Sequence, residues 1–94
     1  MGANPWGSVD EVERRNLRVD IVAPEKMRWS GEATQVIVPG TDGSVGILPG
    51  RLPLLTSLTS GDVRVQDLTG QWTSFHVGGG FVSMWDDVVE VLDC

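Results

Sequence analysis

The sequence is poor in cysteine, histidine, basic residues and long apolar runs. Its 94 residues include one cysteine, Cys94, and one histidine, His76, which excludes an internal disulfide and argues against a Cys/His zinc site. Seven Lys and Arg against thirteen Asp and Glu give a net charge of -6. A surface that binds nucleic acid needs clustered cations, so the composition disfavours a nucleic-acid-binding protein. No apolar run reaches about 18 residues and no signal-peptide core is present, so the sequence predicts neither a membrane span nor secretion.

Two parts of the chain differ in composition. Residues 1–16 carry glycine, proline and charged residues with few apolar ones, and we expect them to form a mobile arm. The segment Ser8–Glu11 fits a helix-capping box, so an ordered helical turn is the alternative. The remaining residues, 17–94, are enough for one small domain with a single core.

From residue 17 onward the apolar pattern is that of strands. Leu17–Val22 alternates with a period of two, and turn signals recur about every 8–12 residues, as in all-β sandwiches and barrels. Two packed sheets suit nine or so short strands. We expect strands at Leu17–Val22, Met27–Gly31, Ala33–Val38, Ser44–Ile47, Leu54–Leu58, Val63–Gln66, Gln71–Val77, Phe81–Met84 and Val88–Leu92.

Glycines and prolines predict how these strands are connected. Gly31 and Glu32 allow a bend or bulge. Pro39 should end its strand because proline donates no ladder hydrogen bond. The strand before it is apolar on both faces and should be central. The segment Gly46–Leu55 combines two prolines with apolar residues, and we expect a shaped, partly buried connection there.

Several blocks of sequence point to one family. Leu17–Glu25 reads LRVDIVAPE, 39–46 reads PGTDGSVG, and Ile47–Thr56 reads ILPGRLPLLT. Further blocks are SGEA at 30–33, GDVRV at 61–65, GGFV at 79–82 and VVEVL at 88–92. In order and spacing these resemble the N-terminal domain of the epsilon subunit of F-type ATP synthases, whose motif G-I-x-P-G-H-A-P-L-L-T is similar to the block at 47–56. The resemblance covers about Leu17 to Asp93.

The resemblance implies a flattened β-sandwich and a non-catalytic role in the rotor. Such domains sit in the central stalk, joining the gamma subunit to the c-ring and supporting the coupling of proton flow to ATP synthesis. This places the chain at the cytoplasmic face of the bacterial plasma membrane, held only through protein partners and without a cofactor. The residues implied on the c-ring side are Thr41, Asp42, Gly43, Ser44 and Arg51. Those implied on the gamma side are Gly78, Gly79, Gly80 and Phe81.

The sequence departs from the family pattern in two ways. Arg51 and Leu52 replace the usual His-Ala pair, which suggests a different polar contact, with a ring carboxylate or with Asp42. The chain also ends at Cys94, whereas family members commonly continue into a two-helix hairpin that binds ATP in some of them. We therefore expect this chain not to bind ATP.

Simpler explanations and one rival function stand beside these assignments. The three glycines at 78–80 lack a following helix for a phosphate loop, and an ordinary bend between strands accounts for them as well as a close approach of gamma does. Asp62 and Asp86–Asp87 fit turn chemistry better than calcium binding, and His76 fits a surface better than a catalytic site. Four tryptophans leave a free-standing β-sandwich module for sugar or peptide as the alternative function.

Overall fold

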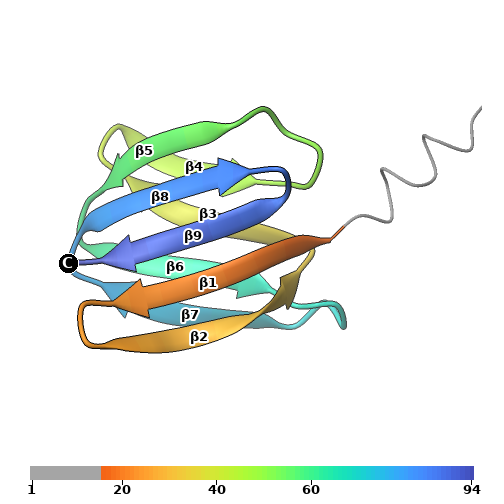
Figure 1. The fold of residues 1–94 in the computed structure, drawn as a ribbon, viewed down its shortest axis with the longest axis horizontal. Helices are drawn as coiled ribbons and strands as arrows, with labels where there is room; N and C mark the ends of the chain where they lie inside the picture. The colour runs from red at the N-terminus through yellow and green to blue at the C-terminus, as the bar shows by residue number, and fades with distance from the viewer. Residues whose placement is uncertain (1–15) are drawn as a thin grey trace, which may run out of the picture.

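The computed structural model describes residues 16–94, which form nine β-strands and no helix (Figure 1). The strands are β1 (Leu17–Ala23), β2 (Lys26–Ala33), β3 (Gln35–Gly40), β4 (Gly43–Ile47), β5 (Leu54–Leu58), β6 (Gly61–Gln66), β7 (Trp72–Val77), β8 (Gly80–Trp85) and β9 (Val88–Asp93). The all-β prediction is confirmed. The arm predicted for residues 1–16 lies, apart from Asn16, outside the described residues. Within these residues no helix is long and apolar enough to cross a membrane.

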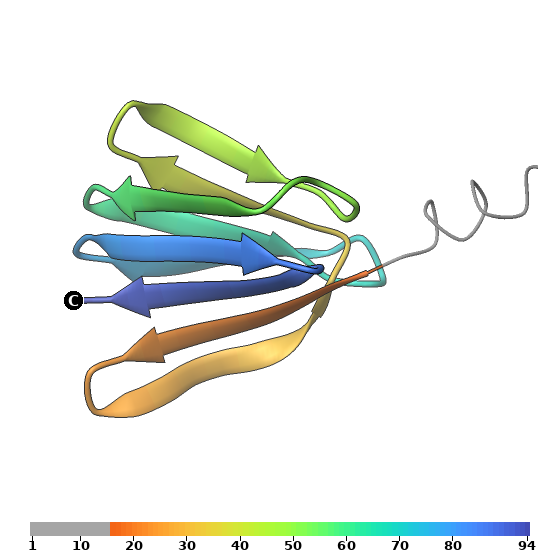
Figure 2. The same ribbon diagram turned by 45° about the horizontal axis from the view of Figure 1, so that its top comes forward.

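The strands form one continuous sheet that folds over on itself (Figure 2). One half, the five-strand half, has the order β5-β8-β9-β1-β2, and the four-strand half has the order β4-β3-β6-β7. The two halves meet at one pair, Gly40 opposite Leu58. All pairings are antiparallel except that of β1 with β9. This arrangement is the predicted sandwich of two facing sheets.

The core lies between the two halves and is made by the alternate residues of each strand. Val82 and Met84 of β8 are buried while Phe81 and Trp85 are exposed, as a period of two requires. No polar or charged side chain is fully buried within residues 16–94. The buried set is Leu17, Val19, Ile21, Ala33, Val36, Val38, Ile47, Leu58, Val63, Val65, Val77, Val82, Met84, Val89 and Val91.

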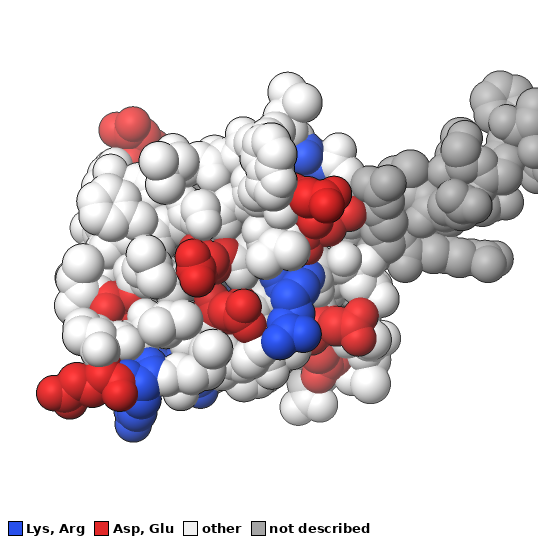
Figure 3. All heavy atoms as spheres, in the orientation of Figure 1, with Lys and Arg blue, Asp and Glu red and all other residues white. Residues whose placement is uncertain are grey.

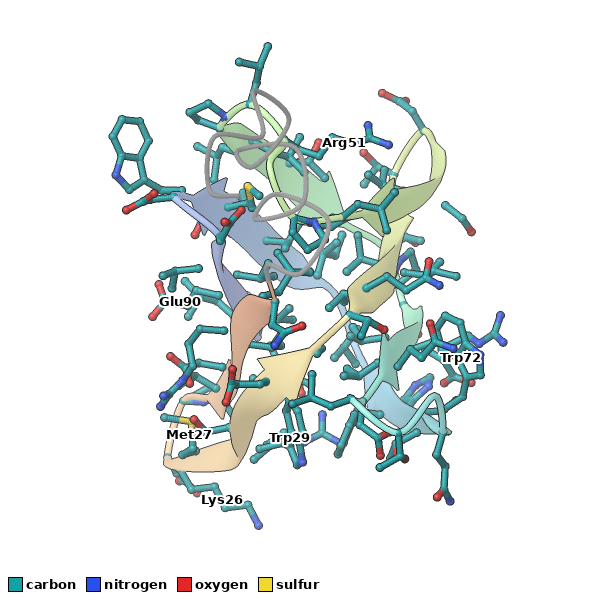
Figure 4. The ribbon with its side chains drawn as sticks, turned by 90° about the vertical axis from the view of Figure 1, so that its right-hand side faces the viewer. Lys26, Met27, Trp29, Arg51, Trp72 and Glu90 are labelled. Atoms are coloured by element: carbon teal, nitrogen blue, oxygen red, sulfur yellow. The ribbon has the colours of Figure 1, made fainter. Side chains whose placement is uncertain are left out.

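Side chains close the seam between β2 and β7, the two outermost strands of the halves. The rings of Trp29 and Phe75 lie 5.8 Å apart between centroids, and Figure 4 shows Trp29 between the two halves. Arg28 Nη1 donates to the His76 carbonyl oxygen and, at 2.9 Å, to Asp93 Oδ2. A Cβ on Gly31 would lie 2.9 Å from the Trp29 ring, so this glycine makes room for the indole.

Three local expectations were wrong. The register is regular at Gly31–Glu32, and the irregularity of the β1–β2 ladder lies at Arg28, between the pairs Ile21–Trp29 and Val22–Met27. Pro39 does not end β3, because it pairs with Ser44 and its carbonyl accepts from Thr59 N at 2.9 Å.

The connection between β4 and β5 is also more open than expected. Leu52 is 85 % exposed and Leu48 is 39 % exposed, so residues 48–53 form a largely solvated loop rather than a partly buried one. Within it only Gly50 requires glycine, with a φ of 80°. The centrality of β3 is confirmed, because it pairs with β4, β5 and β6.

Candidate functional site

The β3–β4 hairpin carries four of the residues predicted on the c-ring side. Thr41 and Asp42 form a two-residue turn, closed by the pair Gly40–Gly43, and all residues from Thr41 to Ser44 are exposed. Gly43 has a φ of 126°, and a Cβ on Gly40 would lie 2.7 Å from the Gly43 carbonyl oxygen. Thr41 N donates to the Ser57 carbonyl at 3.2 Å, which ties the turn to β5. The hairpin therefore presents short polar side chains from a fixed backbone.

The bend between β7 and β8 carries the residues predicted on the gamma side. Gly79 and Gly80 have φ values of 120° and 135°, and a Cβ on Gly80 would overlap the Leu92 carbonyl oxygen at 1.9 Å. Gly78 differs, because its φ is ordinary and the nearest atom to an added Cβ is 4.0 Å away. Two of the three glycines are thus required by the bend itself, and Phe81 follows with its ring 50 % exposed.

The hairpin and the bend lie at the same end of the sandwich. Gly40 pairs with Leu58, Leu58 pairs with Gly80, and Gly80 pairs with Asp93, which makes one row across four strands. Neighbouring strands in a sheet lie about 4.8 Å apart. Gly40 and Gly80 are separated by two such spacings, so they lie about 10 Å apart. Figures 1 and 2 show both turns at the end where the chain terminates. The predicted c-ring and gamma groups therefore adjoin each other.

Arg51 lies at the opposite end. It follows Gly50, whose backbone N donates to Asp87 Oδ1 at 2.7 Å, in the turn between β8 and β9. The five residues of β4 separate this loop from the β3–β4 hairpin (Figure 1). The structure does not bring Arg51 together with Thr41–Ser44, nor does it pair Arg51 with Asp42.

An exposed apolar surface covers the outer side of the five-strand half. The register places Phe81 beside Leu92, Leu92 beside Val22, and Val22 beside Met27. A second row pairs Trp85 with Val88. We call this surface the apolar face, and its large exposed members are Met27 54 %, Leu55 75 %, Phe81 50 %, Trp85 70 %, Val88 45 % and Leu92 41 %.

Among the residues of the apolar face, only Phe81 was predicted from the sequence to bind a partner. The signal was present in β8 and β9, whose apolar residues fall on both faces of the strand rather than one. Val82 and Met84 account for the core, which leaves Phe81 and Trp85 without a partner inside the domain. An exposed set of this kind marks an interaction site in soluble proteins.

Carboxylates lie in the middle of the apolar face (Figure 3). Asp20 and Glu90 are directly opposite each other on the parallel strands β1 and β9. Asp20 accepts from Ser30 Oγ at 2.6 Å and lies 3.5 Å from Arg18 Nε, so its charge is partly balanced. Glu90 is exposed and, among residues 16–94, has neither an ion pair nor a side-chain hydrogen bond. The face is therefore apolar at its edges and acidic at its centre.

The remaining titratable side chains are scattered. His76 is on the surface, as expected, with Nδ1 3.2 Å from Asp62 Oδ1. Asp86 and Asp87, with φ values of 52° and 63°, form the β8–β9 turn at the other end of the molecule from Asp62. Across the described residues, no three His, Cys, Asp or Glu side chains converge on a point where a metal ion would fit.

The tryptophans also lie apart. Trp29 is in the β2–β7 seam, Trp85 is at the end of β8, and Trp72 on β7 lies under Arg64, with the guanidinium carbon 4.9 Å from the ring centroid. Figure 4 shows Trp72 on the outer side of the four-strand half, away from Met27 and Glu90 on the other half. These three rings form no common platform for a sugar.

Comparison with known families identifies the domain. Residues 16–93 match the model of the family described as ATP synthase, Delta/Epsilon chain, beta-sandwich domain. The chain belongs to this family. The resemblance to ATP synthase epsilon chains found in the sequence is thereby confirmed.

Two relatives agree with this membership. The ATP synthase epsilon chain of Desulforudis audaxviator is 49 % identical over 75 residues, covering 80 % of this chain and 54 % of the relative. That of Alkalilimnicola ehrlichii is 45 % identical over 76 residues, covering 81 % and 54 %. The chain thus spans about half the length of the relatives it matches.

Two solved structures share the fold. A chain of the Euglena gracilis mitochondrial ATP synthase, in a structure of OSCP, F1 and c-ring, aligns with a TM-score of 0.78 at 18 % identity, covering 83 % of this chain and 50 % of that one. A chain of the Tetrahymena thermophila mitochondrial ATP synthase, from the central stalk and c-ring, aligns with a TM-score of 0.68 at 16 % identity, covering 86 % and 65 %.

Proposed function

We propose that this chain is a rotor subunit of a proton-translocating F-type ATP synthase, where it joins the gamma subunit to the c-ring. In this role the chain carries out no chemical step. It binds the central stalk to the c-ring while proton flow turns the ring. It would be attached peripherally to the membrane, on its cytoplasmic face, through these two partners. Family membership supports the complex, and the surfaces of the domain support the two contacts.

The apolar face is the observation that carries the gamma contact. Its exposed members, from Met27 to Trp85, lie side by side on paired strands, and a free protein gains nothing from exposing them together. Interface cores are rich in aromatic residues and methionine, which are present here. Gamma would cover this face, place apolar side chains on Phe81 and Trp85, and offer a cation to Glu90.

The β3–β4 hairpin is the proposed c-ring contact. It ends in exposed Thr41, Asp42 and Ser44, which suit the polar loops of a ring. The hairpin points along the strands, whereas the apolar face looks across them (Figure 1). Two partners can therefore bind at once, and the bend at Gly78–Gly80, beside the hairpin, would lie where they meet.

Calorimetric titration with purified gamma tests the main contact. The chain should bind, and replacing Trp85 with alanine should weaken binding about 30-fold, because buried aromatic anchors contribute about 2 kcal/mol or more. Leu68→Ala is the matched control, since Leu68 is 52 % exposed in the β6–β7 turn, away from the face. No binding by the unaltered chain, or equal losses in both variants, would contradict the proposal.

A further inference from the structure

The two seams of the sandwich are closed to different degrees. Four half-buried apolar residues pack against the core from its margins, namely Trp29, Phe75, Val45 and Leu54. Trp29 and Phe75 stand at the β2–β7 seam and fill it with two rings in contact. Val45 of β4 and Leu54 of β5 stand at the other seam, where smaller side chains leave the interior open.

The open seam holds a cleft of about 320 Å³ beside the loop at 48–53. Ile47 and Met84, both at most 2 % exposed, form part of its lining, so the cleft reaches the core. Val45 and Leu54 flank it, and Leu52, at 85 % exposure, stands at its edge. The lining is thus mainly apolar and continues the core toward solvent.

Arg51 is the one charged side chain that lines this cleft. Within residues 16–94 its guanidinium has neither a hydrogen bond nor an ion pair, in a chain whose net charge is -6. An unpaired cation beside an apolar opening attracts an anion and fixes its direction of approach. The lining is therefore complementary to an apolar group that has a carboxylate next to it.

We propose that the β4–β5 cleft is a docking site for one bulky apolar side chain of a partner protein, held beside a carboxylate that pairs with Arg51. The inserted side chain fills the β4–β5 seam, as the Trp29 ring fills the β2–β7 seam. The inference rests on the proposed function, because a gamma subunit that covers Leu55 on the outer side of β5 extends to this opening. It also gives Arg51 a role apart from the c-ring hairpin.

A minimal probe tests the chemistry without the partner. N-acetylphenylalanine carries one aromatic ring and one carboxylate, and it should shift the NMR methyl signals of Val45, Ile47, Leu54 and Met84 in the full chain. Its neutral amide should bind about threefold more weakly, as expected for an exposed charge pair. Arg51→Gln should remove that difference. Arg64→Gln should keep it, because Arg64 of β6 lies over Trp72 and does not line the cleft. Shifts spread over the surface, or equal binding of acid and amide, would overturn the proposal.

Filling the cleft tests its use by gamma. Val45→Phe or Leu54→Phe should close the seam, leave the thermal unfolding temperature unchanged or higher, and weaken gamma binding tenfold or more. If gamma binds these variants as tightly as the unaltered chain while Trp85→Ala still weakens it, the cleft inference fails and the proposed function stands. If gamma does not bind the unaltered chain, both fail.

A bulky apolar side chain of the same chain, Trp6, could occupy the β4–β5 cleft in place of a partner side chain. The Trp6→Ala substitution in the full chain distinguishes these two occupants. We expect the affinity for N-acetylphenylalanine to stay the same. A tenfold gain in affinity on this substitution would mean that the chain fills its own cleft, and it would contradict a partner as the occupant.

Discussion

Three adjacent glycines in the β7–β8 bend differ in what they require. Gly80→Ala places a Cβ 1.9 Å from the Leu92 carbonyl at a φ of 135°, so it must displace β9 or the bend. We expect a loss of about 2–4 kcal/mol in the free energy of unfolding, measured by urea denaturation. Gly78→Ala should change it by less than about 0.5 kcal/mol, because the nearest atom to its added Cβ is 4.0 Å away. Equal effects of the two substitutions would contradict this account.

Asp67 at the β6–β7 turn should make stability depend on acid pH. The hydrogen bond from the Thr69 side chain is the main cause that lowers the pKa of the Asp67 carboxyl below 3.8. Desolvation opposes it, and the backbone amides of Gln71 and Thr69, which also donate to the carboxylate, add to the lowering. A pKa lowered by folding stabilises the fold above pH 3.8, and that contribution disappears as the pH falls through the folded-state pKa.

Asp67→Asn removes the titrating group and keeps an oxygen acceptor. The stability difference between the two proteins should therefore be constant near neutral pH and vanish in strong acid. Urea midpoints measured from pH 7 to pH 2 check this. A difference that persists at pH 2 would show that the substitution acts through packing instead.

For single residues, local turn chemistry could be predicted from the sequence, but positions that depend on distant strands could not. The hairpin residues Thr41–Ser44 could be placed, because a Gly-Thr-Asp-Gly turn has local chemistry. The place of Arg51 at the opposite end could not, because it depends on the direction of β4. The Gly31–Glu32 bulge was predicted from local permissiveness, whereas this glycine actually serves a contact with the Trp29 ring.

The apolar part of the β2–β7 seam is closed by the Trp29 ring of β2 against Phe75 of β7. Trp29→Ala should cost about 2–4 kcal/mol, because it opens the seam against Phe75. Trp85→Ala, at a 70 % exposed position, should change stability by less than about 0.5 kcal/mol. Thermal and urea unfolding of the two variants make the comparison, and a larger loss for Trp85 would contradict the assignment of these two rings.

The strands themselves were largely predictable from period-two patterning and turn residues. All nine exist close to their expected positions, and the errors are at ends, such as β3 running through Pro39 to Gly40. The pairing order could not be read from the sequence. It depends on long-range packing, as in the parallel pairing of β1 with β9, which joins the first strand to the last.

The apolar face of the whole molecule exists only because β2, β1, β9 and β8 pair in this order. Met27 is far in the sequence from Phe81 and Leu92, and each of the three is an ordinary exposed apolar residue by itself. Register brings them into one row on neighbouring strands. The same folding leaves the β4–β5 seam open, a property of the two halves together that no single strand predicts.

Capture of the tagged full chain from detergent-solubilised membranes, with the bound proteins identified by mass spectrometry, is the decisive test that this chain joins gamma to the c-ring. We expect the gamma subunit and the ring c-subunit to be recovered together with the unaltered chain. A chain carrying both Phe81→Ala and Trp85→Ala should recover much less gamma at equal folded content. Recovery of neither protein with the unaltered chain would rule out this role.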